Sequence, residues 1–375
     1  MVGGGHAGRR PRVALDTRLV RAAPGGIATY VRELAVRMPP LDERREHLHV
    51  VPRGGTAFSA QARAARTLTP AHHRWERQAL GLELLRWRVD LLHSPDFIAP
   101  VIGFRHSVVT VHDLAFLREP RHLAPDAWRY YAQVGASAAR ADAVITDSEA
   151  VRADVIERLR IPDARVVVVP LGRDPRCGTL AYEAVTTALG ALGLAPGYLL
   201  CVSTFDPRKN LLGLLDEYRQ LREAVRDVPP LVLAGHRTVH VAAVRAHAAA
   251  LGLAPYVHLQ PDVPDALMPG LHAGARIFVL LSRDEGFGLP LVDAMASGVP
   301  CVVSRRGALP EVAGHAARLV DPDRRGDAAE ALAALLGDDV LARRLGAEGR
   351  QMAARYRWAS TAASTLAVYD AVLGR

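Results

Sequence analysis

The sequence predicts an α/β fold of two doubly wound, Rossmann-like domains that face one another across a cleft. Three observations lead to this prediction. Short apolar runs recur along the chain, and each is followed by a segment with helical periodicity. The runs do not alternate between apolar and polar residues, which is typical of strands buried on both faces of a parallel sheet. They also fall into two successive sets, and 375 residues are enough for two domains.

A break in the pattern separates the candidate strands of the two sets. The first set comprises residues 12–17, 47–52, 90–94, 107–112, 142–147 and 166–170. The second set comprises residues 198–204, 231–235, 256–260, 277–282, 300–304 and 316–320. The stretch GRDPRCGT interrupts the pattern, so we expect the domain boundary within residues 172–197. Beyond residue 325 the periodicity is helical.

Charge and cysteine content restrict the classes of function. The formal net charge of +8 implies attraction to anions, and a nucleotide substrate or an anionic membrane surface would satisfy it equally well. No basic run is interleaved with aromatic residues, so nucleic acid is not indicated. The three cysteines form no CxxC pair, which predicts neither a disulfide framework nor a zinc site and is typical of a reducing cytoplasm. The N-terminal MVGGGHAGRRPR lacks the apolar core of a signal peptide, and no run of 18 apolar residues predicts a membrane span.

The segment DPRKN follows the first strand of the second set and holds the only lysine and the only asparagine of the chain. The apolar spacing after it predicts an amphipathic helix, with Asn210 as the N-cap. Arg208 and Lys209 then lie at the helix N-terminus, where the helix dipole favours an anion. Two cations at such a position predict a diphosphate site. The retention of Lys209 among otherwise exclusive arginine indicates that a compact point charge is required there.

The segment SRDEGFGLPLVDAMASG joins a predicted strand to a predicted helix. Glu285 stands beside two glycines, which allow backbone N–H groups to approach a ligand closely. Asp293 follows eight residues later, about two helical turns along. Carboxylates accept hydrogen bonds from hydroxyl groups and discriminate their positions, so the segment predicts a site for sugar and ribose hydroxyls.

Two features of the first domain also follow predicted strands. Gly25 and Gly26 allow a tight turn and a close approach to a ligand, but they do not form GxGxxG, which argues against a nicotinamide or flavin dinucleotide. His112 ends a strand at the edge where ligands are expected. Such a histidine can donate to a substrate hydroxyl or act as a general base, and a structural role is as common.

With these motifs, the chain resembles the retaining GT-B glycosyltransferases of family 4, and most closely the mannosyltransferase-like members. The stretch EGFGLPLVDAMASGVPC is similar to the family pattern EGFGLPxLEAMAxGxPV, except that Asp293 replaces the second glutamate. Lys209 matches the lysine of the family. Arg208 beside it is similar to the mannosyltransferase subgroup, whereas other members carry the arginine further upstream, where this chain has Thr204. The glycine pair, the VHD histidine and the RWA segment near the C-terminus also look like family positions.

The resemblance implies a domain plan and an activity. It implies an acceptor-binding N-terminal domain over residues 1–180, a nucleotide-sugar-binding domain over residues 181–355 and a final helix over residues 356–375 that crosses back to the first domain. The implied activity moves mannose from a nucleotide-diphosphate sugar, with GDP-mannose favoured, to a glycan, lipid-linked or natural-product acceptor. No cofactor and no metal are expected, because the cations of the chain would stabilise the leaving group.

The resemblance also assigns roles to residues. Arg208 and Lys209 would neutralise the diphosphate, Glu285 would hold hydroxyls of the donor sugar, and His112 would contact that sugar near its 6-position. The acceptor would attack the face that the leaving group departs from, and we find no carboxylate pair suited to double displacement. Further donor-binding positions are Gly25, Gly26, Val263 near the base, the backbone of Gly286, Phe287, Gly288 and Leu289, and Asp293 at the ribose.

Alternatives of three kinds stay open. One is a transferase of the same fold that uses a UDP- or dTDP-sugar. Another is a nicotinamide-dependent oxidoreductase, and a third is a non-catalytic nucleotide-binding or scaffolding protein. The segment WERQALGLELLRW (75–87) is amphipathic and basic, so it could lie at the inner face of a membrane; we expect it instead to pack on the first sheet.

Overall fold

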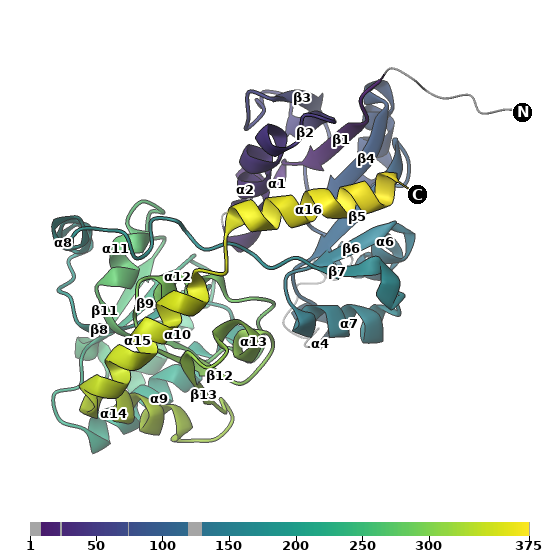
Figure 1. The fold of residues 1–375 in the computed structure, drawn as a ribbon. Coiled ribbons are helices and arrows are strands. Elements are labelled where there is room, and N and C mark those ends of the chain that lie inside the picture. The colour runs from purple at the N-terminus through teal and green to yellow at the C-terminus, as the bar shows by residue number, and fades with distance from the viewer. Residues whose placement is uncertain (1–8, 23–24, 74, 119–129, 375) are drawn as a thin grey trace, which may run out of the picture. The chain divides into compact units, whose positions relative to one another are not determined.

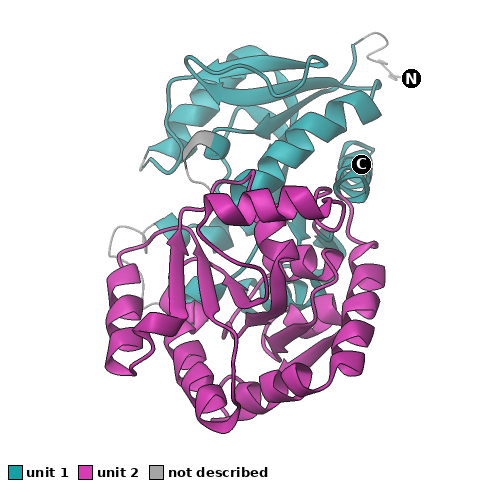
Figure 2. Ribbon diagram, turned by 90° about the vertical axis from the view of Figure 1, so that its left-hand side faces the viewer, with its two compact units in different colours: residues 1–170, 358–375 teal, residues 171–357 magenta. Residues whose placement is uncertain are grey.

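The computed structural model describes residues 9–22, 25–73, 75–118 and 130–374, and it divides the chain into two compact units (Figure 1). Unit 1 comprises Met1–Pro170 and Trp358–Arg375, and unit 2 comprises Leu171–Arg357 (Figure 2). The sequence prediction placed the first boundary at residue 180 rather than 170. The N-terminal eight residues and Pro24, which entered the sequence argument, lie outside the described residues.

Within its described residues, unit 1 is built on a seven-stranded parallel sheet with the order β3-β2-β1-β4-β5-β6-β7. Its strands are β1 Arg12–Asp16, β2 Glu46–Pro52, β3 Ala62–Thr67, β4 Val89–Ser94, β5 Phe104–Val111, β6 Ala143–Thr146 and β7 Val166–Val168. Its helices are α1 Leu19–Ala22, α2 Gly26–Leu41, α3 Glu76–Leu84, α4 Ala115–Arg118, α6 Val134–Arg140, α7 Glu149–Leu159 and α16 Trp358–Leu373, with 3₁₀ turns η1 Leu85–Trp87 and η3 Asp163–Arg165.

Strand β3 is the one strand of unit 1 that the sequence prediction missed. It lies at the edge of the sheet and pairs only with β2. Its sequence ARAART carries two exposed arginines, Arg63 and Arg66, while Ala65 and Thr67 are buried. An edge strand covered on one side needs no continuous apolar run, so the pattern that revealed the other strands is absent here.

The final helix returns to the first unit, as predicted. Helix α16 belongs to unit 1 and packs against α2. The hydroxyl of the fully buried Tyr369 lies 2.7 Å from Nδ1 of His93 in β4, and Thr361 donates to the carbonyl of Pro170 at 2.8 Å. Buried polar groups need such partners, so these contacts fix the helix at one rotation on the sheet.

Unit 2, all of which is described, is built on a six-stranded parallel sheet with the order β10-β9-β8-β11-β12-β13. Its strands are β8 Tyr198–Val202, β9 Leu231–Gly235, β10 Val257–Pro261, β11 Ala275–Leu280, β12 Cys301–Ser304 and β13 Ala317–Val320. Its helices are α8 Tyr182–Ala191, α9 Leu211–Ala224, α10 Val241–Ala250, α11 Met268–Ala273, α12 Leu289–Ala296, α13 Leu309–Ala313, α14 Asp327–Gly337 and α15 Asp339–Ala353, with 3₁₀ turns η4 Pro207–Lys209 and η5 Ala254–Tyr256.

The central strands confirm the reason for the predicted fold. Every residue of β4, β8 and β12 is buried, because helices cover both faces of each sheet. The two doubly wound parallel sheets are the architecture that the continuous apolar runs predicted. Within the described ranges, no helix has the length and apolar character needed to cross a bilayer.

Candidate active site

The order of the strands in unit 2 creates a place for a ligand at β8 and β11. The chain runs outward from β8 through β9 to β10, and then returns to form β11 on the other side of β8. The loops that follow β8 and β11 therefore leave the sheet in opposite directions. Ligands of doubly wound sheets bind at such a switch point, beyond the carboxyl ends of the strands. The segment DPRKN follows β8, and EGFG follows β11.

Lys209 and Glu285 meet at this switch point. Lys209 Nζ lies 2.6 Å from Glu285 Oε1, and only 8% and 11% of the two side chains are exposed. The resemblance assigned Lys209 to the diphosphate and Glu285 to the sugar of one donor, and the structure brings the two side chains into direct contact. A buried ion pair gains little net stability, because both charges lose their hydration. The pair therefore places a cation and a carboxylate, each able to make hydrogen bonds beyond this contact, at the switch point.

The backbone of the β11 loop is held by residues that the sequence prediction did not single out. Ser282 donates to the same Oε1 of Glu285 at 2.9 Å, and Ser304 at the end of β12 donates to the carbonyl of Ser282 at 2.5 Å. The N–H of Ala308 donates to the carbonyl of Glu285 at 2.9 Å. A Cβ on Gly307 would lie 2.5 Å from that carbonyl oxygen, so only glycine fits. The sequence signal that could have identified Gly307 is the segment RRGALPE, which follows a predicted strand.

The N-terminus of α12 begins directly after EGFG. Gly288 has φ +94°, a left-handed conformation that favours glycine, and it turns the chain into the helix. The N–H groups of Leu291 and Val292 both donate to the carbonyl of Gly288, so the hydrogen bonds of the helix begin there. Amides ahead of that point, at Phe287, Gly288 and Leu289, have no carbonyl one turn earlier in the helix. Such a helix start suits oxygen atoms of a ligand.

The loop after β8 differs from its prediction in one respect. Asn210 does occupy the N-cap position of α9, but its side chain makes no capping hydrogen bond, so that part of the prediction is wrong. The residue has φ +55° and ψ +36°, a left-handed conformation that asparagine tolerates better than most residues. It thus reverses the chain between η4 and α9, which places Lys209 at the helix start. Arg208 lies beside it, and its carbonyl accepts the N–H of Arg283 from the other loop at 2.9 Å.

Asp293 already has a partner in the structure. Its Oδ1 accepts the backbone N–H of Asp174 at 2.8 Å, so the side chain fastens the segment that enters unit 2. Desolvation by burial raises the pKa of this carboxyl from 3.8 to about 7. Its predicted contact with a ribose stays a prediction. Val263, predicted near the base, lies two residues beyond the end of the edge strand β10.

His112 in unit 1 is 14% exposed at its side chain and is hydrogen-bonded through both ring nitrogens. Nδ1 lies 2.6 Å from Oδ2 of Asp147, and Nε2 lies 2.9 Å from the carbonyl oxygen of Pro95. Tyr30 packs edge-on against the ring. Burial disfavours the charged ring, but the charge and hydrogen bond of Asp147 outweigh it and raise the pKa of His112. A contact with a donor sugar would replace the bond to Pro95; that role stays a prediction.

Gly25 and Gly26 lie at the start of helix α2. Gly25 has φ +137°, and its carbonyl accepts the N–H of Thr29 at 3.1 Å, so the tight turn expected of the glycine pair is present. Their contact with a ligand stays a prediction. Among the described residues, no group of three or more histidine, cysteine, aspartate or glutamate side chains is arranged to hold a metal ion.

Two doubly wound parallel sheets and a last helix that returns to the first unit are the plan of GT-B glycosyltransferases. Comparison with known proteins identifies the family. Residues 24–176 match the model of "Glycosyltransferase Family 4", and residues 192–352 match that of "Glycosyl transferases group 1". The chain is 30% identical over 308 residues to "O-antigen chain mannosyltransferase B" of Escherichia coli, covering 82% of this chain and 79% of that protein.

Two further comparisons extend this result. The chain is 33% identical over 241 residues to "MMP alpha-(1->4)-mannosyltransferase" of Mycolicibacterium hassiacum, covering 62% of this chain and 54% of that protein. Its fold matches the structure of sucrose-phosphate synthase from Thermosynechococcus elongatus with a TM-score of 0.78 at 20% identity, over 97% of this chain and all of the other. The chain therefore belongs to glycosyltransferase family 4, which confirms the resemblance predicted from its motifs and makes it a glycosyltransferase rather than an oxidoreductase.

Proposed function

We propose that the protein transfers mannose, with retention of anomeric configuration, from GDP-mannose to a hydroxyl group of a glycan, lipid-linked or natural-product acceptor. The named mannosyltransferases among its relatives support the choice of sugar. The observation that carries the proposal is the Lys209–Glu285 pair at the switch point of unit 2, with Arg208 beside it.

A donor offers better partners to both members of this pair. Its diphosphate would pair with Lys209, and hydroxyls of its sugar would donate to Glu285. Each charge then keeps a partner throughout the exchange, so the cost of leaving a buried charge unpaired is avoided. The cation would also stabilise charge that grows on the diphosphate as it leaves, and it is already in place before reaction.

The reaction needs no protein nucleophile. The acceptor oxygen forms a bond to the anomeric carbon on the face where the bond to the phosphate oxygen breaks. The electron pair of the broken bond stays on the diphosphate, and the proton of the acceptor hydroxyl passes to that leaving group. We propose that Lys209 and Arg208 supply the positive charge for this step without a metal or another cofactor.

A panel of nucleotides tests the donor. Because a ligand that binds only the folded state raises its melting temperature, GDP should raise it more than UDP or dTDP at equal concentration. A larger shift with UDP or dTDP would establish the alternative donor. Activity should survive excess EDTA, and an EDTA-sensitive rate would contradict metal independence.

The product tests the stereochemistry. The anomeric proton of the transferred sugar, followed by NMR during the reaction, should show the configuration of the donor. A product of inverted configuration would refute the retaining mechanism.

We also propose peripheral contact with an anionic membrane at the cytoplasmic face. Leu80 and Leu84 of α3 are buried against the first sheet, which confirms the packing expected for this segment. The opposite side leaves Leu82 and Leu85 exposed, and Arg86 donates to the carbonyl of Arg66 nearby. Apolar side chains flanked by arginine suit an anionic lipid surface. The three buried free cysteines suit a reducing compartment.

Vesicle flotation tests this contact. The protein should float with phosphatidylglycerol vesicles, and the double change Leu82→Glu and Leu85→Glu should abolish flotation. Val340→Glu, at an exposed apolar residue of α15, is the matched control and should leave flotation unchanged. Equal flotation of the double variant would contradict the proposal.

A further inference from the structure

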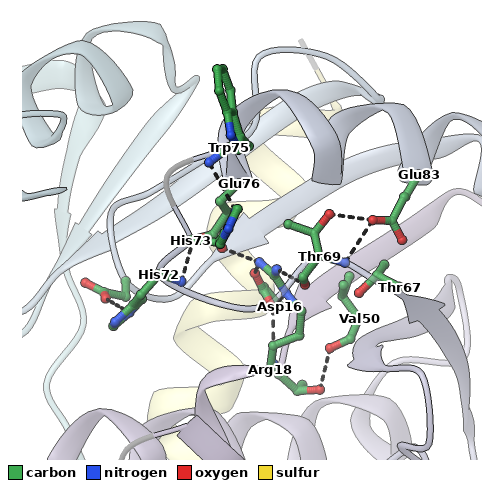
Figure 3. Close-up of polar contacts among 12 residues, drawn as sticks. Asp16, Arg18, Val50, Thr67, Thr69, His72, His73, Trp75, Glu76 and Glu83 are labelled. Atoms are coloured by element: carbon green, nitrogen blue, oxygen red, sulfur yellow. Dashed lines mark hydrogen bonds and ion pairs between the residues drawn. The ribbon is translucent and has the colours of Figure 1, made fainter.

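A second polar cluster lies at the carboxyl edge of the first sheet, around Arg18 (Figure 3). Arg18 follows β1 and is 2% exposed at its side chain. Its Nε and Nη2 donate to the two oxygens of Asp16 at 2.9 and 2.5 Å, and Nη2 also pairs with Glu76. Its Nη1 donates to the carbonyl of Thr69 at 2.9 Å. The guanidinium is therefore enclosed and neutralised by two carboxylates.

Glu76 connects the guanidinium of Arg18 to the more exposed His72. Its second oxygen accepts the backbone N–H of His72 at 2.7 Å (Figure 3). His72 has φ +62°, a left-handed backbone that this bond helps to hold. Its Nε2 lies 3.2 Å from Oδ2 of Asp96, and the side chain is 44% exposed. The ring of Tyr130 lies 4.4 Å from that of His72.

Asp96 is the buried partner of the exposed side chain of His72. It follows β4, it is 8% exposed, and its Oδ2 also accepts the hydroxyl of Tyr130 at 3.0 Å. Two donors thus converge on one oxygen. Among the described residues, no hydrogen bond reaches the other oxygen, Oδ1, or Nδ1 of His72. A carboxylate that is nine-tenths buried and half satisfied is costly unless a ligand or water completes it.

The charge of the cluster determines which kind of ligand can hydrogen-bond to Oδ1 of Asp96 and Nδ1 of His72. Among the described residues, the cluster contains three carboxylates (Asp16, Glu76 and Asp96), one guanidinium (Arg18) and one imidazole (His72), and these five groups sum to −1 when His72 is protonated and to −2 when it is neutral. Arg18 is the arginine that the described residues place in the cluster, and its donors already have partners, so its guanidinium is not available to a phosphate. An anionic group of a ligand would be repelled by this negative charge, whereas a hydroxyl group can donate a hydrogen bond to a carboxylate.

We propose that Asp96 and His72 bind the hydroxyl groups of the acceptor, and that this acceptor is neutral at the end that receives the sugar, such as an uncharged glycan, rather than a phosphorylated sugar or polyol. The proposal rests on the proposed transferase function and names the substrate class of that site. Asp96 Oδ1 accepts one acceptor hydroxyl, and His72 Nδ1 contacts a neighbouring one. Tyr130 fixes Asp96 by its hydrogen bond and so orients the free oxygen.

Acceptor kinetics with GDP-mannose test the proposal. Methyl α-mannoside serves as the neutral probe and mannose 6-phosphate as the anionic probe, and GDP release without acceptor measures donor hydrolysis. The wild-type enzyme should prefer the neutral probe by about tenfold or more in kcat/KM, because a buried carboxylate accepts a hydroxyl donor and repels a second negative charge. A preference for the phosphorylated probe, or no preference, would overturn the proposal.

Two variants separate binding from support of the fold. Asp96→Asn keeps an acceptor for Tyr130 and should raise KM for the neutral probe about tenfold, while donor KM and donor hydrolysis stay unchanged. His72→Asn, which suits the left-handed backbone, should raise the same KM less. Glu46→Gln removes a carboxylate at the opposite end of the sheet and is the matched control. It should change neither the KM for the neutral probe nor the donor parameters. Equal losses in donor and acceptor parameters in Asp96→Asn would show a structural role and overturn the proposal.

Failure of this inference can be told apart from failure of the proposed function. If GDP-mannose is neither hydrolysed nor able to raise the melting temperature, the proposed donor is wrong. If the donor is used but the phosphorylated probe is preferred, only the inference about the acceptor is wrong.

Discussion

The buried ion pair of Lys209 and Glu285 in unit 2 and the buried cluster around Arg18 in unit 1 both lie at the carboxyl edge of a sheet, but they are assembled differently. In unit 2, Lys209 and Glu285 form a single ion pair, and each residue lies in a short motif directly after a strand. In unit 1, Arg18 meets Asp16 and Glu76, and the third residue comes from a helix 58 positions away. The first is one ion pair from two short motifs, whereas the second joins two carboxylates to the guanidinium of Arg18. The difference shows that the location of a charged site built from motifs directly after strands can be predicted from the sequence, while a cluster completed by a distant helix cannot.

Breaking the cluster of unit 1 should have the largest effect on stability. Arg18→Met removes the cation that, among the described residues, pairs with both Asp16 and Glu76, and it leaves these two buried carboxylates close together. Loss of one partner from a buried ionic group costs about 3–5 kcal/mol. Urea denaturation should show a loss of this size. Arg63→Met, at an exposed ion pair on β3, is the control and should change the free energy of unfolding little. A loss in Arg18→Met no larger than in this control would contradict the structural role.

Breaking the pair of unit 2 should instead affect turnover. Lys209→Arg keeps the charge but replaces a compact ammonium with a planar fork in a buried place, so we expect about a hundredfold lower kcat with little change in melting temperature. Arg283→Lys, at an exposed position of the neighbouring loop, is the matched control. Near-native kcat in Lys209→Arg would mean that the solitary lysine of the chain carries no chemical requirement.

The close packing of Gly307 against the backbone of Glu285 can be tested without changing any charge. Gly307→Ala would place a Cβ 2.5 Å from the carbonyl oxygen of Glu285 and would strain a residue with φ +57°. Displacement of Glu285 should lower kcat/KM for the donor about tenfold, because small misplacements at a site are costly. Gly337→Ala is the control, since nothing lies within 4 Å of the added Cβ. Unchanged donor kinetics in Gly307→Ala would argue that the β11 loop tolerates movement.

A smaller effect should appear in the pH dependence of stability. The pKa of Asp293 is raised from 3.8 to about 7 in the folded state, so the unfolded state loses its proton first as the pH rises. The stability contributed by this group is therefore fully present below about pH 4, falls between about pH 4 and 7, and stays low above that range. Asp293→Asn keeps an oxygen for the N–H of Asp174 and removes the titration. Its melting temperature relative to wild type should rise by a few degrees between pH 4 and 7; a pH-independent difference would contradict this assignment.

The smallest effect concerns the turn ahead of α9. Asn210 has a left-handed backbone and makes no capping bond. Asn210→Gly should therefore be nearly neutral, whereas Asn210→Ala should cost about 1 kcal/mol. Thermal denaturation of Asn210→Ser distinguishes this from side-chain capping, because serine caps a helix as well as asparagine but does not favour a left-handed backbone, so we expect it to cost as much as Asn210→Ala.

Much of unit 2 was predictable because its site is local in sequence. The apolar runs predicted every strand of its sheet, and the residues that end β8 and β11 stand within a few positions of those strands. The hydrogen-bond partner of the Asp293 side chain was not predictable. It is the backbone N–H of Asp174, which lies 119 positions away and contributes no side-chain contact to this bond. The same limit applies to Gly307, whose need for glycine arises from the nearby backbone of Glu285.

Unit 1 shows the limits of sequence patterns more clearly. Strand β3 carries no apolar run, because an edge strand is stabilised by its one neighbour. His112 stands at a strand end, as predicted, but its contacts with Asp147 and Pro95 depend on which strands are adjacent. The sequence did not predict the cluster of Asp16, Arg18, His72, Glu76 and Asp96, because its members come from the end of β1, separate loops and the start of α3.

The amino-acid sequence was enough to establish two doubly wound sheets, the family, the returning helix and the motifs after β8 and β11. These features depend on hydrophobic burial and on short segments, which act through neighbours along the chain. The tertiary structure decided which charges meet. It paired the solitary lysine with Glu285, gave Asp293 a backbone partner and enclosed Arg18. Hydrogen bonds and ion pairs act over about 3 Å, so they depend on which distant segments the fold brings together.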